Sequence, residues 1–357
     1  MRQKGSGQRA VPNLSFEQPF WHKPPMPERV DFPATLVTGG AGYIGSHMTY
    51  GLLDRGERVV VLDNLSTGVR SLVAPSATFI EGDVADQPRV RELLRKHEIG
   101  AVIHFAGSIV VPDSVSDPLG YYRNNTVASR ALIEACVAEG VRNFVFSSTA
   151  ATYGIPDAPM VTEDTPKEPI NPYGRSKLMT EWMLQDAAQA YDFRYIALRY
   201  FNVAGADPKG RTGQSTPRAT HLIKRACQVA LGREPHLDIF GTDYPTPDGT
   251  GVRDYIHVTD LIAAHLLALD ALRGDAKADV FNCGYGRGLS VRQIIEAVER
   301  VAGRSLPVRE SPRRAGDPPT LVADSTKLKR TLAWTPRYDD VDTIVRSALE
   351  WERRFNG

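Results

Sequence analysis

An α/β fold built on a doubly wound parallel sheet is predicted by three features of this 357-residue sequence. Short apolar segments alternate with amphipathic segments from residue 34 onward, which is typical of a parallel sheet with helices on both faces. The first apolar segment leads into Gly39, Gly42 and Gly45 at the start of a helical pattern. Near residue 203 the composition changes, and Gly, Pro, Thr and Arg become frequent. We therefore expect a Rossmann-type sheet followed by a smaller C-terminal substrate-binding lobe.

The alternation defines the expected elements. Each expected strand is short and apolar, and each expected helix carries apolar residues at a helical period. Strands are expected at residues 35–38, 58–62, 77–80, 101–105, 143–147 and 194–199, and helices at residues 44–54, 88–97, 118–139 and 173–190. Ligands bind at the carboxyl ends of the strands in such a sheet, so the residues that follow each strand are candidates for a functional site.

The composition argues against several classes of partner. The sequence has 43 basic and 42 acidic residues and a formal charge of +1, so neither nucleic acid nor an acidic membrane surface is expected as a partner. No apolar run approaches the roughly 18 residues of a membrane span. Cys136, Cys227 and Cys283 lie far apart, which favours buried free thiols over a disulfide or a metal site. A cytoplasmic protein is expected.

The glycine-rich segment fits a dinucleotide site. Gly39 and Gly42 permit a tight turn and close approach to a pyrophosphate, and Gly45 lets the following helix pack against the strand. The helix N-terminus offers free N–H groups to the anion. Asp63 ends the next strand at a distance suited to a ribose 2′-hydroxyl, and its charge would repel a 2′-phosphate. The segment therefore predicts NAD rather than NADP.

Tyr173 and Lys177 are the principal candidates for catalysis. A spacing of four residues places both on one face of a helix. Tyrosine, with a pKa of about 10, is a poor base at neutral pH, and a nearby ammonium is expected to lower that pKa. Such a pair suits removal of a proton from a sugar or alcohol hydroxyl. Most isolated Tyr-x-x-x-Lys spacings are ordinary helix surface, and it is the glycine-rich segment upstream that gives this one weight.

Three regions follow from these features. Residues 1–33 are rich in proline and lack a regular period, so we interpret them as a disordered N-terminal extension. Residues 34–202 are expected to form the NAD-binding domain, with returns from about 256–300. Residues 203–255 and 301–350 are expected to form the substrate lobe, because they contain long turn-rich loops of the kind that often carry function.

Five stretches resemble the UDP-glucose 4-epimerase family of the extended short-chain dehydrogenase/reductase superfamily. They are residues 37–47, 103–107, 171–177, 198–202 and 248–257, and the resemblance runs from about 35 to 350. It implies NAD-dependent oxidation at sugar C4, rotation of the 4-keto intermediate and re-reduction, which interconverts UDP-glucose and UDP-galactose. In this scheme Tyr173 is the base, Lys177 holds the phenolate, and the Thr149 hydroxyl lies beside the sugar oxygen.

The resemblance also assigns the binding residues. For the cofactor they are Gly39, Gly42, Tyr43, Ile44, Gly45, Asp63, Asn64, Asp83, Val84, Phe105, Ala106, Gly107, Asn124, Tyr173, Lys177 and Phe201. For the UDP-sugar they are Thr149, Asn202, Leu222, Ile239, Phe240, Arg253, Tyr255, Arg314, Asp317 and Leu321. Within this set, Arg253 and Arg314 are expected on the diphosphate, where a planar guanidinium makes bidentate contacts. A homodimer formed through helices is expected as well.

The sequence departs from the family at three places. Ile109 stands where many members have a lysine, and Thr220-His221-Leu222 replaces Asn-Asn-Leu in the substrate lobe. Leu321 stands where some members have a tyrosine against the sugar's 2-substituent, and this smaller wall could admit an N-acetyl group.

Several other functions occur on the same fold. Ala150 and Ala151 occupy the positions where sugar dehydratases of this superfamily carry acid/base residues, which argues against dehydration. UDP-xylose/UDP-arabinose and UDP-N-acetylglucosamine 4-epimerases would share the catalytic residues, and they stay open. A non-catalytic dinucleotide-binding regulator is a different class, and such proteins usually lack the Tyr or the Lys.

Overall fold

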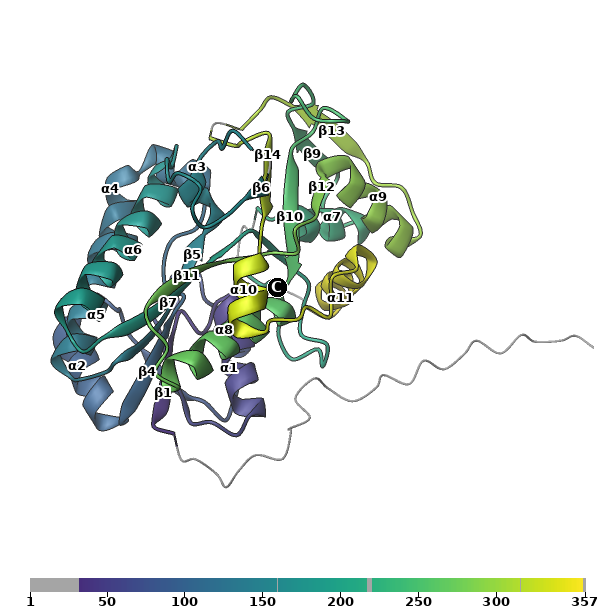
Figure 1. The fold of residues 1–357 in the computed structure, drawn as a ribbon. Coiled ribbons are helices and arrows are strands. Elements are labelled where there is room, and N and C mark those ends of the chain that lie inside the picture. Colours follow the sequence, from purple (N-terminus) through teal and green to yellow (C-terminus); the bar gives the residue numbers. More distant parts are fainter. Residues whose placement is uncertain (1–31, 159, 217–219, 315, 356–357) are drawn as a thin grey trace, which may run out of the picture. The chain divides into compact units, whose positions relative to one another are not determined.

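The computed structural model describes residues 32–158, 160–216, 220–314 and 316–355. Its main feature is a seven-stranded parallel sheet in the order β11-β7-β5-β4-β1-β2-β3 (Figure 1). The strands are β1 Ala34–Thr38, β2 Val59–Asp63, β3 Thr78–Glu81, β4 Ile99–His104, β5 Asn143–Thr149, β7 Arg194–Tyr200 and β11 Asp279–Cys283. The predicted α/β fold is confirmed, and β11 joins the sheet from far along the chain.

Helices cover both faces of this sheet (Figure 1). On one face lie α2 Gln87–Lys96, α5 Ala128–Ala138 and α6 Pro172–Ala190, with neighbours in contact. On the other face, α1 Tyr43–Asp54 packs against α8 Val258–Arg273. Apolar residues of the first face, such as Leu36, Leu132 and Phe144, form a core with exposed fractions of 0%. The core holds the carboxyl ends of the strands in fixed positions.

The single helix expected over residues 118–139 is wrong in detail. The structure divides it into α4 Pro118–Tyr121, a π-helical segment η2 Tyr122–Val127, and α5. The preceding α3 spans Val111–Ser116, and the Asp117 side chain accepts a hydrogen bond from the N–H of Gly120 at 3.0 Å to begin α4. A π-helical segment adds a residue to a turn and often occurs at functional sites. Here it carries Asn124 and Asn125.

A second group of elements forms from the rest of the chain. Short strands β6 Met160–Val161, β8 Asn202–Ala204, β10 Val252–His257, β12 Gly288–Ser290 and β14 Thr320–Ala323 make one sheet, and β9 Leu237–Phe240 pairs with β13 Val308–Ser311. The helices are α7 Leu222–Ala230, α9 Val291–Ala302, α10 Thr326–Leu332 and α11 Val341–Arg354, with short turns of helix at η1 Arg70–Leu72 and η3 Ala150–Tyr153. Apolar residues of α7, α9 and α11 form their own core.

The cysteines and the helix lengths bear on two expectations drawn from the composition. The three cysteines are buried and free, as expected, and burial raises the pKa of Cys227 to about 12. In the described ranges no helix has the length and apolar character needed to cross a membrane. Most of the proposed N-terminal extension, residues 1–31, lies outside the described residues.

Candidate active site

The turn between β1 and α1 has the geometry of a phosphate-binding loop. Gly39 has a φ of 70°, and a Cβ there would lie 2.7 Å from the backbone N of Ala106. A Cβ on Gly45 would lie 2.2 Å from the Gly39 carbonyl oxygen, so both positions require glycine. The α1 helix starts after Gly42 without a side-chain cap, so its first N–H groups are available to an anion. These features fit a dinucleotide pyrophosphate.

The acidic end of β2 lies beside this turn. The carboxylate of Asp63 accepts hydrogen bonds from the N–H of Ala41 at 2.9 Å and of Leu65 at 2.8 Å. Each oxygen keeps a second lone pair that a ribose hydroxyl can use. Asn64 donates to Asp83 at 3.1 Å, which joins two predicted cofactor residues that follow β2 and β3. The residues present therefore fit NAD.

The helix α6 places the predicted base and its lysine next to β5. The Asn171 side chain caps α6 by accepting from the N–H of Gly174 at 2.8 Å. Lys177 is 3% exposed, and its ammonium donates to the carbonyl of Ser147 at 3.0 Å. The ammonium also lies 5.0 Å from the centre of the Phe146 ring. Burial lowers the pKa of Lys177 to about 8, so the side chain is mainly a cation at neutral pH.

Tyr173 shows one clear difference from the sequence argument. A lowered pKa was expected from the neighbouring ammonium, but burial raises the pKa of Tyr173 in the protein alone. The hydrogen bond with Thr149 acts in the opposite direction and is the smaller effect. The structure thus brings Thr149, at the end of β5, to the phenol of Tyr173. The phenol is therefore neutral at neutral pH in the structure.

The predicted diphosphate residues lie in the second group of elements. Arg253, on β10, donates to the carbonyl of Val252 at 2.9 Å, and its guanidinium lies 3.9 Å from a carboxylate oxygen of Asp317. The guanidinium of Arg314 lies 3.8 Å from the centre of the Phe240 ring, and burial lowers its pKa. Among the described residues no carboxylate lies within 4.0 Å of Arg314. A partly buried cation that makes no such ion pair with the described residues favours an anionic ligand.

Not every predicted side chain faces this region. Ile239 is 1% exposed and packs in the core formed by α7, α9 and α11. Its neighbour Phe240 points the other way, as alternation along β9 requires. The side chain of Ile239 therefore faces the core, and only its backbone is left for the predicted contact with the UDP-sugar. Val84 is likewise buried in the core below the large sheet, at 7% exposed.

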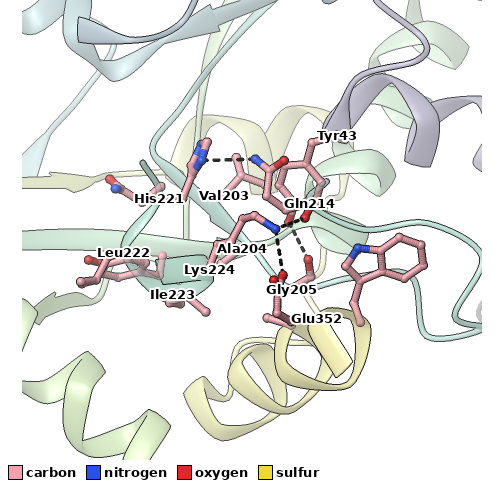
Figure 2. Close-up of a pocket in the computed structure, with 14 residues that line it drawn as sticks. Tyr43, Val203, Ala204, Gly205, Gln214, His221, Leu222, Ile223, Lys224 and Glu352 are labelled. Atoms are coloured by element: carbon pink, nitrogen blue, oxygen red, sulfur yellow. Dashed lines mark hydrogen bonds and ion pairs between the residues drawn. The ribbon is translucent and has the colours of Figure 1, made fainter. Parts of the chain in front are cut away.

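Several predicted substrate residues line a small cavity, which has a volume of about 30 Å³ (Figure 2). Asn202, Leu222 and Tyr255 line it, along with Tyr43 of the glycine turn and His221. Because the Oε1 of Gln214 accepts from the N–H of Thr216 at 3.0 Å, its Nε2 donates to the Nδ1 of His221 at 3.2 Å. His221 therefore carries its proton on Nε2. Burial lowers its pKa to about 4, which keeps it neutral.

Sequence reasoning missed the buried polar residues that support the site. Asn125 of η2 donates to the carbonyl of Ser108 at 2.9 Å and to the hydroxyl of Ser176 at 3.0 Å, which ties η2 to α6. Arg199 donates to Glu181 at 2.9 Å and to the Tyr153 hydroxyl at 3.0 Å. The only signal in the sequence was the presence of polar residues inside apolar strands and a helix.

The sequence of this chain matches a known protein family. Residues 35–284 match the NAD dependent epimerase/dehydratase family. A UDP-glucose 4-epimerase of Azospirillum brasilense is 56% identical over 321 residues, which cover 90% of this chain and 92% of that protein.

Solved structures of epimerases are also similar to this chain. The crystal structure of UDP-glucose 4-epimerase from Brucella ovis in complex with NAD has 48% identity and a TM-score of 0.86, with 89% and 98% of the two chains covered. The UDP-Glc/GlcNAc 4-epimerase from Campylobacter jejuni has 47% identity and a TM-score of 0.79, with 91% and 100% covered. This chain is an NAD-dependent enzyme that belongs to the NAD dependent epimerase/dehydratase family.

Proposed function

We propose that this enzyme interconverts UDP-glucose and UDP-galactose by inverting the configuration at sugar C4. The observation that carries the proposal is the cluster of Tyr173, Thr149 and Lys177 at the end of β5. The residues that follow Thr149 are Ala150 and Ala151, which offer no acid or base for an elimination. A single proton-transfer site then suits oxidation and reduction at one carbon.

In this mechanism Tyr173 exchanges the proton of the sugar 4-hydroxyl. The Thr149 hydroxyl bonds to the Tyr173 phenol and is placed to share the same sugar oxygen. The phenolate takes the proton as the C4–O bond becomes a carbonyl. After the 4-keto sugar has turned over, Tyr173 returns the proton to the same oxygen. The active site thus needs one base that acts twice.

The cofactor is held by the glycine turn, Asp63 and the residues that follow β3 and β4. When bound, NAD supplies a hydride acceptor and donor for C4 and a positive charge near the phenol. Lys177 adds a cation on the same side, because its pKa of about 8 keeps the ammonium mostly charged at neutral pH. These charges favour the phenolate against the desolvation that otherwise raises the pKa of Tyr173.

Two arginines are proposed to bind the diphosphate. Arg314 has its guanidinium stacked on Phe240 and is partly buried, and Arg253 lies close to Asp317. Arg313, which precedes Arg314 in the chain, differs because it pairs with Asp243 at 2.7 Å on the surface. The anion is therefore expected at Arg314 and Arg253, and Arg313 is the natural control. Residues 203–255 and 301–350 would form the substrate lobe, and residues 34–202 the NAD-binding domain.

A second substrate is favoured by one observation. Leu321 forms the proposed wall at the sugar's 2-position, is 7% exposed, and packs with Ala150, Tyr153 and Val161. A leucine there is shorter than a tyrosine, so a UDP-N-acetylhexosamine is the second candidate substrate. The Campylobacter jejuni relative is described as acting on both UDP-Glc and UDP-GlcNAc.

The helical face of the large sheet is proposed to form a homodimer. Large apolar side chains are exposed along α3, α4, η2 and α6, which contact one another, namely Val115 at 51%, Leu119 at 77%, Val127 at 54% and Trp182 at 55%. Exposed apolar side chains on neighbouring helices are typical of a protein–protein interface. A Trp182→Glu variant is expected to be monomeric in analytical ultracentrifugation.

The substrate experiment is direct. The purified enzyme is incubated separately with UDP-glucose, UDP-xylose and UDP-N-acetylglucosamine, without added NAD, and C4 configuration is followed by NMR. We expect UDP-galactose to form from UDP-glucose. Inversion of the pentose alone would replace the hexose proposal with a UDP-xylose/UDP-arabinose 4-epimerase. Absence of inversion in all three, in enzyme shown to contain NAD, would refute epimerisation.

A further inference from the structure

Tyr200 is the last residue of β7 and lies beside the proposed reacting groups. In the register of the sheet it pairs with Thr149 of β5. Its hydroxyl is hydrogen-bonded to the hydroxyl of Ser147, which lies two residues before Thr149 and on the same face of β5. Burial raises the pKa of Tyr200 well above its ordinary value, so this phenol stays protonated. The proposed proton transfer does not use it.

Ser147 is also the residue that holds Lys177. Its carbonyl accepts from the Lys177 ammonium at 3.0 Å, and within the described ranges this is the one hydrogen-bond acceptor of that ammonium. The carbonyl lies just beyond the end of β4, because the last β4 pair joins His104 to Phe146. On that side Ser147 has no strand partner among the described residues, so its carbonyl can accept a side-chain donor. The place of the ammonium thus depends on the backbone at Ser147.

We propose that Tyr200 is a positioning residue for the epimerase reaction: through the Ser147 hydroxyl it fixes the carbonyl that holds the Lys177 ammonium near Tyr173. The inference rests on the proposed function. Tyr200 is a firm support, because it lies between two strand neighbours, Thr149 of β5 and Cys283 of β11. Ser147 is paired with β7 but lies beyond the last β4 pair, so the hydrogen bond with Tyr200 adds a second support for its carbonyl direction.

The charged and titratable groups around Lys177 leave this carbonyl as its main stabilising contact. On its own helix, Tyr173 lies four residues before it, and further along α6 Glu181 is paired with Arg199. From β4, His104 stacks on Phe146, and burial together with the charge of Lys177 lowers its pKa to about 3. From β7 comes the neutral Tyr200. Losing the carbonyl contact would therefore disfavour the cation and lower the pKa of Lys177 further.

The test compares three variants of the NAD-loaded enzyme. Tyr200→Phe and Ser147→Ala each remove one hydroxyl of the pair and keep the backbone carbonyl. Tyr285→Phe is the matched control, because it removes a partly buried tyrosine hydroxyl that donates to Asp260 at 2.7 Å and accepts from the N–H of His257, two contacts that the proposal does not use. The measurements are kcat and KM for UDP-glucose against pH, and the titration of Tyr173 by NMR of ring-labelled tyrosine.

We expect Tyr200→Phe and Ser147→Ala to lower kcat by roughly 10- to 100-fold with KM unchanged, because a small displacement of a catalytic group is enough. The alkaline limb of kcat should move to lower pH, and the pKa of Tyr173 should rise. The double variant should be no worse than either single variant, since both remove the same bond. Tyr285→Phe should keep the wild-type kcat, limb and Tyr173 titration.

The outcomes separate this inference from the proposed function. If the wild type inverts C4 but Tyr200→Phe keeps its kcat, limb and Tyr173 titration, Tyr200 is only a packing residue and the inference is overturned, even if the melting temperature falls. If the wild type inverts no sugar, the proposed function fails, and the Tyr173 titration still tests the link. If Tyr200→Phe does not fold, Ser147→Ala decides in the same way.

Discussion

The two sides of the proposed active site are built differently. On the catalytic side, Lys177 and the Glu181–Arg199 pair are almost fully buried, and each is held by strands of the large sheet. On the nucleotide side, Arg253 lies on β10, beside Asp317, and Arg314 lies in a loop. The guanidinium of Arg314 stacks on Phe240, which leaves its N–H groups for an anion. Groups that move protons are fixed before substrate arrives, whereas groups that recognise the nucleotide await an anion to complete their contacts.

The sharpest test of the catalytic side is removal of the base. Tyr173→Phe deletes one hydroxyl, which is hydrogen-bonded with Thr149. We expect kcat to fall by about 10³-fold, within the usual contribution of a general base, while UDP binding and thermal unfolding stay near wild type. Epimerase assays and UDP titration calorimetry measure the two parts. Full activity in this variant would remove Tyr173 from the mechanism.

The buried Arg199–Glu181 pair of the catalytic side should contribute to the free energy of unfolding. Arg199 and Glu181 are each 4% exposed and joined by a hydrogen bond at 2.9 Å from Nε. Arg199→Leu leaves the Glu181 carboxylate buried and unpaired, so the free energy of unfolding should fall by about 3–5 kcal/mol in urea titrations. The control is Arg142→Ala, which breaks an exposed pair with Asp192 and should cost less than about 1 kcal/mol. Equal losses in the free energy of unfolding would mean that the buried pair supports the fold no more than an exposed surface pair does.

The same division explains what could be predicted from the sequence. Alternating apolar segments and the glycine turn predicted the large sheet, because burial periodicity and positive φ are local properties. Phe240 and Ile239 were assigned together, yet strand alternation sends Ile239 into the core. The division of residues 118–139 by a π-helical segment had no local signal.

The pKa of Tyr173 was mispredicted for a physical reason. A spacing of four residues reveals the nearby ammonium but not the depth of burial, and burial is the larger effect. The support of the Lys177 ammonium by Ser147, 30 positions apart in sequence, is a tertiary contact of the same kind. Electrostatics at the site therefore required the fold.

On the nucleotide side, Arg314→Leu should separate binding from stability. Loss of charge-assisted bonds to the diphosphate is expected to raise KM for UDP-glucose by about 10- to 100-fold, with little change in kcat. The free protein should become no less stable, because the variant removes a partly buried cation that has no carboxylate within 4.0 Å among the described residues. Arg313→Leu, which breaks a surface pair with Asp243, should leave KM unchanged. A lower kcat at unchanged KM in Arg314→Leu would place this arginine with the catalytic groups instead.

The smallest expected effect is a pH dependence that the catalytic side imposes on stability. The pKa of Lys177 falls from 10.5 to about 8 on burial, so between these values the unfolded chain binds a proton that the folded protein has released. Stability therefore rises with pH across this window and is independent of Lys177 below it. The rise in the free energy of unfolding should be roughly 1 kcal/mol per pH unit at most. Tyrosines that ionise only when unfolded oppose this rise near the upper end of the window.

The measurement compares urea midpoints of wild type and Lys177→Met from neutral pH to about pH 9.5. The difference between the two proteins gives the contribution of Lys177. Lys177→Met should lose the positive slope and be the more stable protein at neutral pH, because it no longer buries a cation. Parallel pH curves would mean that Lys177 titrates as an ordinary lysine and that the catalytic side is more open to water than its burial indicates.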